Sequence, residues 1–251
     1  MSAGARAAAC WVVLCGAALA QQGDRPGEVQ PGLPPELQVP PAPVLTPDEA
    51  LASFRVADGW RVELVAAEPL VVDPVMVSFD GDGRLWVVEM RGYMPDADGT
   101  DEDAPVGEVA VLHDDDGDGV MDRRVVFLDG LVLPRAVAPT RGGALVLAPP
   151  DLLFCRDTDG DGYADERTVV DTGFGGIASP EHAPNGLLPT LDNAFRLAND
   201  SRQYRWGPPA AGEPARWYAE ATGGGGQWGI TQDDVGRVFY DTNSDPVRGD
   251  L

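Results

Sequence analysis

Two stretches of this sequence carry carboxylates at the alternate spacing that holds hard metal ions. Residues 114–122 (DDDGDGVMD) and 157–165 (DTDGDGYAD) both follow the pattern D-x-D-x-D-G-x-x-D. Oxygen ligands that converge in a tight turn suit Ca²⁺, which binds roughly six to eight oxygens with loose geometry. The sequence therefore predicts two calcium sites. The expected ligands are Asp114, Asp116, Asp118, Asp122, Asp157, Asp159, Asp161 and Asp165.

These loops differ from an EF-hand. An EF-hand needs Glu or Asp at the last position of its loop, where this chain has Val125 and Thr168. Runs typical of β-strands flank both stretches, so we expect hairpin loops whose ions fasten the fold rather than carry out chemistry. A solvated acidic turn without a fixed ion is the alternative.

Four segments that would position these loops share a hairpin pattern, in which two apolar runs flank a tight turn. The segments are 77–87, 137–147, 188–197 and 230–240, with turns at Gly83, Gly143, Asn193 and Gly236. Gly and Asn suit such turns because tight hairpins need positive φ. A recurrence of about 40 to 60 residues is typical of propeller blades. We predict an all-β chain folded as a β-propeller, with a β-sandwich as the alternative.

Composition divides the chain into three parts. Residues 1–20 combine Arg6, a short apolar run and a small-x-small end, the pattern of a cleaved signal peptide, with a retained anchor as the alternative. Residues 21–45 form a Pro-rich linker. Residues 46–251 hold the propeller, which follows a short capped helix. A cleaved signal predicts a periplasmic or secreted protein with no membrane span in the mature chain.

The propeller segment holds about three and a half blades on this spacing. Alternating residues over 60–66 predict a strand that would complete a final blade. We therefore expect a fragment of a six- or seven-bladed ring.

The charge of the chain limits its partners. It carries 41 acidic and 18 basic residues, a formal net charge of −23. Such a surface repels phosphate backbones and anionic lipid, so we expect no nucleic-acid partner. Cys155 is the one cysteine beyond the signal segment, so an internal disulfide is excluded and a buried thiol is expected.

Several segments carry a family resemblance. They are 64–69 (LVAAEP), 89–93 (EMRGY), 182–187 (HAPNGL), 227–234 (QWGITQDD) and 248–251 (RGDL). Together they resemble the membrane-bound-dehydrogenase-like propellers of planctomycetes, which look like distant relatives of the soluble quinoprotein glucose and sorbosone dehydrogenases. The resemblance covers residues 46–251. It implies oxidation of a sugar or alcohol, pyrroloquinoline quinone (PQQ) as cofactor and a C-type haem electron acceptor.

The resemblance also implies roles for particular residues. His182 matches the histidine that removes the hydroxyl proton, while a structural loop histidine is the alternative. Asn185 and Gln227 would donate hydrogen bonds to substrate or quinone, and Arg135 would face the anionic cofactor. Around Gln227 this sequence lacks the family's arginine, and Ala183 replaces the arginine that usually follows the histidine. A quinone with three carboxylates needs cationic partners.

Two other functions remain open on the sequence. One is a non-catalytic calcium-bound propeller that binds glycans or proteins. The other is a metal-dependent lactonase-like hydrolase, in which a channel ion polarises the substrate carbonyl.

Overall fold

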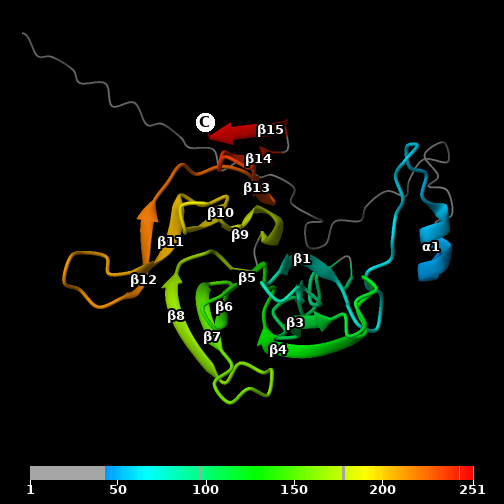
Figure 1. The fold of residues 1–251 in the computed structure, drawn as a ribbon, viewed down its shortest axis with the longest axis horizontal. Coiled ribbons are helices and arrows are strands. Elements are labelled where there is room, and N and C mark those ends of the chain that lie inside the picture. Colours follow the sequence, from blue (N-terminus) through cyan, green and yellow to red (C-terminus); the bar gives the residue numbers. More distant parts are fainter. Residues whose placement is uncertain (1–42, 97, 177–178, 243, 251) are drawn as a thin grey trace, which may run out of the picture. The chain divides into compact units, whose positions relative to one another are not determined.

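The computed structural model describes residues 43–250 apart from 97, 177–178 and 243 (Figure 1). The predicted signal peptide and nearly all of the predicted linker lie outside this part of the chain. The first element is helix α1 (Pro47–Ser53), which Thr46 caps. The Thr46 Oγ1 accepts from the Glu49 backbone N–H at 3.3 Å, and the Glu49 carboxylate accepts from the Thr46 backbone N–H at 2.8 Å. This pair is the predicted capping box.

Strands dominate the rest of the described chain and form four antiparallel sheets. The first sheet holds β1 (Pro74–Phe79), β2 (Leu85–Glu89), β3 (Gly107–His113) and β4 (Arg123–Leu131). The second holds β5 (Ala136–Thr140), β6 (Gly143–Ala148), β7 (Asp151–Arg156) and β8 (Glu166–Thr172). The third holds β9 (Asn185–Pro189), β10 (Phe195–Ala198), β11 (Arg202–Gly207) and β12 (Arg216–Ala221). The fourth holds β13 (Ile230–Gln232), β14 (Val238–Thr242) and β15 (Asp245–Asp250).

These sheets are arranged as the blades of a β-propeller. In each sheet the strands follow one another in chain order, and the first strands β1, β5, β9 and β13 of successive sheets contact one another (Figure 1). The predicted all-β propeller is therefore confirmed. Within the described residues no helix is long or apolar enough to cross a membrane.

The predicted hairpin turns are confirmed in three blades and shifted in the fourth. Gly83, Asn193 and Gly236 have φ of 80°, 62° and 84°. In the second blade, however, the positive φ values belong to Arg141 and Gly142, and Gly143 begins β6. A Cβ on Gly143 would lie 2.2 Å from the Cys155 carbonyl oxygen, so glycine is needed there for the close approach of β7.

The prediction of a strand over residues 60–66 is wrong for the described structure, because this segment pairs with no other strand. Its one described backbone link to the sheets joins the Met121 N–H to the Val65 carbonyl at 2.8 Å. Alternation of apolar side chains favours a strand only where a neighbour supplies the ladder. Trp60 remains 77% exposed.

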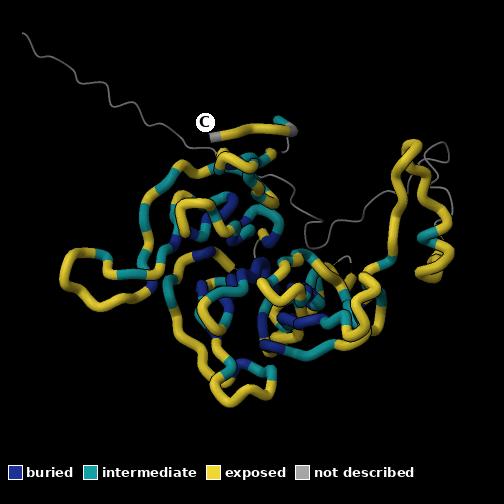
Figure 2. Tube along the Cα trace, viewed as in Figure 1, coloured by how far each residue is buried: buried dark blue, intermediate teal, exposed yellow. Residues whose placement is uncertain are grey.

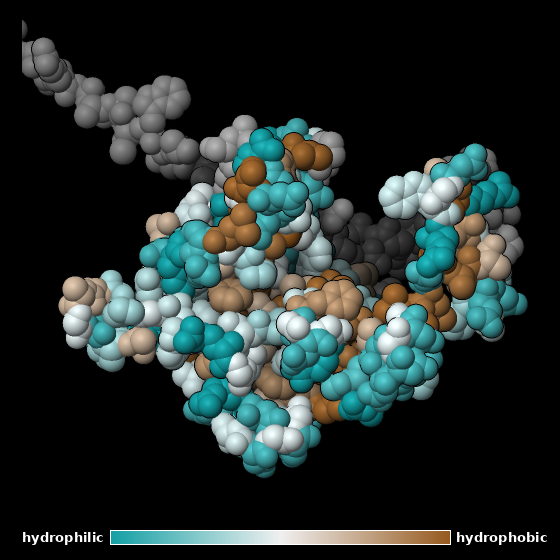
Figure 3. Space-filling model, in the orientation of Figure 1, coloured by the Kyte–Doolittle hydropathy of each residue, from teal (hydrophilic) through white to brown (hydrophobic). Residues whose placement is uncertain are grey.

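Buried residues gather in the strands of the blades (Figure 2), and apolar side chains of neighbouring blades form shared core clusters. Trp86 and Phe127 of the first blade meet edge to face at 4.6 Å, and Val137 and Val146 of the second blade belong to the same cluster. Cys155 is fully buried there, and burial raises its pKa to about 11. The predicted burial of this thiol is thus confirmed. Apolar surface is also visible over the β13–β15 sheet (Figure 3), where Val235 and Val247 are exposed.

Candidate functional site

The loops of the propeller gather at two opposite ends of the sheets. Because neighbouring strands run antiparallel, the β1–β2, β3–β4, β5–β6 and β7–β8 connections share one end. We call it the aspartate end, since residues 114–122 and 157–165 lie there. The β2–β3, β4–β5, β8–β9 and β12–β13 connections lie at the other end, which we call the histidine end because it carries His182.

The first aspartate loop (residues 114–122) brings three carboxylates together. One oxygen each of Asp114, Asp116 and Asp122 lies within 4.8 Å of the others. The Asp114 carboxylate accepts from the backbone N–H groups of Gly117 at 2.6 Å and Gly119 at 2.8 Å. These amides lower the pKa of Asp114. Asp118, the fourth predicted ligand, instead accepts from the Val120 N–H at 2.8 Å.

The second aspartate loop (residues 157–165) repeats this geometry with one change. Asp157, Asp159 and Asp161 have oxygens within 4.8 Å of one another. Asp157 accepts from the N–H groups of Gly160 and Gly162 at 2.6 and 2.8 Å, and these bonds lower its pKa. The remaining predicted ligand, Asp165, accepts from both the N–H and the hydroxyl of Thr158. In the first loop Asp122 makes the equivalent bond, accepting from the Asp115 N–H at 2.8 Å, and it also belongs to the trio.

Each loop also docks on the segment that precedes its own blade. In the second loop the Ala164 N–H donates to the Phe127 carbonyl of β4 at 2.7 Å, and the Tyr163 hydroxyl donates to Asp129 at 2.8 Å. In the first loop the equivalent position is Met121, whose N–H donates to Val65 at 2.8 Å. The loops thus fasten their blades to earlier parts of the chain.

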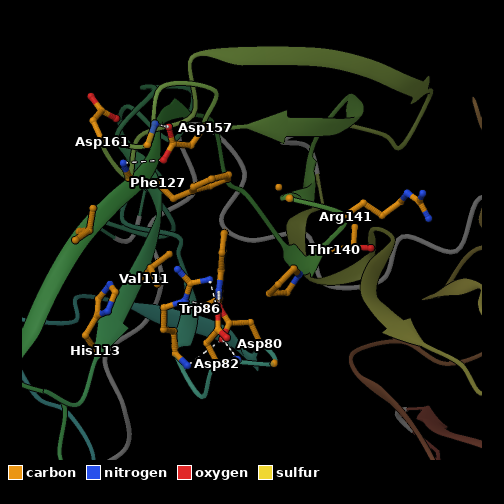
Figure 4. Close-up of a pocket in the computed structure, with 18 of the residues that line it drawn as sticks. Asp80, Asp82, Trp86, Val111, His113, Phe127, Thr140, Arg141, Asp157 and Asp161 are labelled. Carbon is orange, nitrogen blue, oxygen red and sulfur yellow. Dashed lines mark hydrogen bonds and ion pairs between the residues drawn. The ribbon is translucent and has the colours of Figure 1, made fainter. Parts of the chain in front are cut away.

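A cleft of about 670 Å³ opens beside the second loop, between the first two blades (Figure 4). The β1–β2 turn with Asp80 and Asp82 forms one wall, and the β5–β6 turn with Arg141 forms another. His113 lines the same cleft. Burial, followed by the charges of Arg123 and Arg84, lowers its pKa and favours the neutral imidazole. The cleft combines polar groups with the apolar side chains of Trp86 and Phe127, and its lining includes Asp157 and Asp161 of the second carboxylate trio.

At the histidine end, His182 closes a short 3₁₀ turn, Pro180–His182. Its Nδ1 lies 3.1 Å from the Ser179 hydroxyl, and its carbonyl accepts from the Asn199 side-chain amide at 2.6 Å. The first contact holds the imidazole ring of His182, and the second holds its main chain. No described residue hydrogen-bonds to its Nε2.

The structure brings Asn185 and Gln227 together through hydrogen bonds within the protein, and their predicted bonds to substrate or quinone stay a prediction. The buried Asn185 amide donates to the Gln227 carbonyl at 2.7 Å and to the Ala183 carbonyl at 3.0 Å. Its side-chain oxygen accepts from the Gly229 N–H at 2.8 Å. Asn185 thus joins the β8–β9 and β12–β13 connections, and its amide hydrogens are already bonded within the protein.

Arg135 lies at the histidine end, immediately before β5, and is 1% exposed. Its Nη2 donates to the Gly176 carbonyl at 3.0 Å, while Nε and Nη1 have no hydrogen-bond partner among the described residues. Burial lowers its pKa to about 10, and the nearby charge of Glu181 acts in the opposite direction. The guanidinium remains charged at neutral pH but is incompletely paired.

Sequence reasoning missed two residues beside this arginine. Burial raises the pKa of Tyr93, and the charges of Glu181 and Glu102 and a hydrogen bond to Glu181 raise it further. Tyr93 lies in the segment 89–93, and Glu181 directly precedes the segment 182–187. Their position in or beside segments that carry the family resemblance is the signal that could have identified them. In the segment 89–93, Arg91 pairs with the fully buried Glu89 at 2.5 Å.

Comparison with known proteins identifies one family model and one structural likeness. The model described as "Domain of unknown function (DUF7133)" matches residues 46–250. No curated protein matches the sequence. Among solved structures, the chain resembles that of a candidate 6-phosphogluconolactonase from Bacteroides uniformis ATCC 8492, at 14% identity and a TM-score of 0.41. The match covers 71% of this chain and spans 56% of that chain.

Proposed function

This chain belongs to the DUF7133 family, and we propose that it is an exported propeller whose aspartate loops bind Ca²⁺ and fasten neighbouring blades. The carboxylate trios carry this proposal. Each trio offers three oxygens within 4.8 Å of one another. Three carboxylates on a flexible loop are the donor set that calcium takes, and water or backbone carbonyls supply its remaining ligands.

The contacts of the second aspartate loop with β4 explain why a calcium ion bound in that loop would stabilise the packing of the first two blades. The second loop reaches across to β4 through Ala164 and Tyr163. Without a cation, three carboxylates held so closely repel one another and oppose the turn that presents Ala164 and Tyr163. A bound Ca²⁺ removes that repulsion. It would therefore stabilise the junction between the first and second blades.

Oxidation of a sugar or alcohol at the histidine end is a second candidate function. It is favoured by the position of His182, whose ring the Ser179 hydroxyl orients through Nδ1. A neutral imidazole oriented in this way could take a hydroxyl proton at Nε2. The hydride from the substrate carbon would need a two-electron cofactor, and a C-type haem protein remains the proposed acceptor of the electrons from that cofactor.

The described residues fit PQQ poorly. Such a quinone brings three carboxylates, whereas Arg135 is one guanidinium and Glu181 adds a negative charge beside it. Two arginines of the first blade, Arg91 and Arg124, already pair with Glu89 and Glu108. We therefore derive no step through the quinone.

A lactonase-like reaction assisted by a metal ion is supported less well. Both carboxylate trios lie at the aspartate end, so an ion bound there would not reach a substrate carbonyl held near His182. A metal-assisted hydrolysis would have to use the cleft beside Asp157 and Asp161 instead.

The second candidate predicts a specific loss of activity. Substituting His182→Ala is expected to lower dye-coupled oxidation of sugars or alcohols by about 100-fold or more, because the proton acceptor is removed. The rate is measured with and without added PQQ. His113→Ala, at the aspartate end, is the matched control and should retain the wild-type rate. Equal rates in the two variants would rule out His182 as the base.

A further inference from the structure

We infer that the cleft between the first two blades binds a short neutral oligosaccharide. The cleft lies at the aspartate end and encloses about 670 Å³, a volume typical of small-molecule sites. Its rim is open to solvent, since the side chains of Asp82 and Arg84 are 81% and 41% exposed. The inference does not depend on the proposed calcium sites. It assigns the glycan binding that the sequence left open to particular residues.

Small residues of the second blade leave the space for this ligand. Trp86 and Phe127 of the first blade form the apolar base of the cleft and are nearly buried. The second blade presents Gly142 and Gly143 of its β5–β6 turn to the same cleft. Glycine has no side chain to fill the cleft, so the space above the aromatic base stays open.

The next junction shows that the propeller fold does not itself require such a space. Phe154 of the second blade and Trp206 of the third each pack against Trp217, with ring centroids 5.5 Å apart. Trp206 and Trp217 pair across β11 and β12, next to the connection that lies at the aspartate end. Large rings from both blades therefore meet there, whereas the first junction has rings on one side and glycines on the other.

The wall formed by the β1–β2 turn is held in place before any ligand binds. The Asp80 carboxylate accepts from the Trp86 Nε1 at 2.9 Å and from the Arg84 Nε at 2.6 Å. It also accepts from the backbone N–H of Asp82 at 2.9 Å. Because these bonds already fix the wall, a ligand would lose little affinity to the ordering of side chains.

Two groups of this wall keep hydrogen-bonding capacity for a ligand. Arg84 donates through Nε and Nη2, and its Nη1 bonds to no described residue. Among the described residues, the Asp82 carboxylate accepts one long bond, from the Arg84 Nη2 at 3.3 Å to its Oδ2. Across the apolar base, Asp157 and Asp161 add further carboxylates (Figure 4). A ligand in the cleft would thus meet a donor and an acceptor side by side, with acceptors opposite.

This mixture of groups selects the class of ligand. A sugar hydroxyl donates and accepts at once, so neighbouring hydroxyls can bond to Asp82 and Arg84 together. Arg84 and Arg123 are already paired with aspartates, and Arg141 places its guanidinium over the Trp206 ring at 4.9 Å. A carboxylate or phosphate therefore gains no free counter-ion, and the carboxylates of the rim repel it. An ammonium group can only donate and would leave the Arg84 hydrogens unused.

Maltotriose, cellotriose and mannotriose test this class, because they are neutral trisaccharides that differ in linkage or in sugar. Calorimetry of the full chain should detect binding of at least one of them at millimolar concentration. Trigalacturonate has the same length but carries carboxylates, and should bind about tenfold more weakly or not at all. The absence of binding by every neutral probe, or binding of trigalacturonate as tight as theirs, would overturn the inference.

Asp82→Ala tests whether the trisaccharide lies in the cleft. Asp82 is exposed and makes one long contact, so its loss should not prevent folding. The affinity should fall by about tenfold, because a charged hydrogen-bond acceptor is removed. Asp103→Ala removes an exposed acid outside the cleft and should leave the affinity unchanged. Equal affinities in the two variants would contradict the proposed site.

Two further measurements separate this site from the proposed calcium sites. Asp82→Ala should keep any calcium-dependent rise in melting temperature, because Asp82 belongs to neither trio. Asp159→Asn removes a trio carboxylate that is not part of the cleft lining, and should keep the affinity for the trisaccharide. Loss of sugar binding in Asp159→Asn alone would place the sugar at the ion and overturn the inference. Sugar binding without any effect of calcium would instead contradict the calcium proposal and support the cleft.

Discussion

Adding calcium to the chelated protein is expected to raise its melting temperature by roughly 5–10 °C for each occupied site. An ion bound only by the folded state at about 100 times its dissociation constant contributes about 2.7 kcal/mol. For a domain of this size, each kcal/mol shifts the melting temperature by about 2–4 °C. The measurement is a thermal melt followed by circular dichroism, with and without a chelator.

Asp159→Asn isolates the second loop in this experiment. It removes one carboxylate of the trio while leaving the Asp157 bonds to Gly160 and Gly162 in place. Its calcium-dependent shift should be about half that of the wild type. Asp103→Asn removes an exposed acid outside both loops and should preserve the full shift. Melting curves that chelation leaves unchanged would mean that the trios are solvated acidic turns.

Phe127→Ala is expected to lower the free energy of unfolding by about 3–5 kcal/mol. Phe127 is 4% exposed, meets Trp86 edge to face and belongs to the cluster that joins the first two blades. Removing its ring leaves a cavity at a junction that the surrounding strands cannot easily close. Urea denaturation gives the change from the shift in midpoint at constant slope.

Phe79→Ala is the matched control for this substitution, because the Phe79 side chain is 63% exposed on β1. It should change the free energy of unfolding by about 1 kcal/mol or less. A loss in Phe127→Ala no greater than that of the control would mean that the two blades do not share a tightly packed core.

Much of the fold followed from local signals in the sequence. Positive φ at Gly83, Asn193 and Gly236 is a demand of the turn itself, so Gly and Asn revealed these hairpins. The aspartate loops were equally visible, because both their ligands and their turn residues lie within nine positions. The prediction of a strand over residues 60–66 was wrong for the opposite reason. A strand needs a neighbouring strand, and the alternation of apolar residues within one segment does not encode that neighbour.

The histidine end was harder to predict, because its residues meet through loops far apart in the chain. Asn185 donates to Gln227 from 42 positions away, and Arg135 reaches Gly176 across 41. No spacing rule connects such pairs. The burial of Arg135 also depends on the β8–β9 connection. The sequence alone shows that Arg135 is charged, but not that its Nε and Nη1 have no hydrogen-bond partner among the described residues.

The docking of each aspartate loop on an earlier segment has a consequence for the order of folding. Ala164 bonds to Phe127 and Met121 bonds to Val65, so each new loop attaches to chain that has already been synthesised. These contacts join each blade to the segment just before it and not to later parts of the chain. During synthesis from the N-terminus, each blade could thus pack on the preceding one before the C-terminal residues have been made. Calcium would then act as each blade forms, and late depletion of the ion would be less harmful than its absence during synthesis.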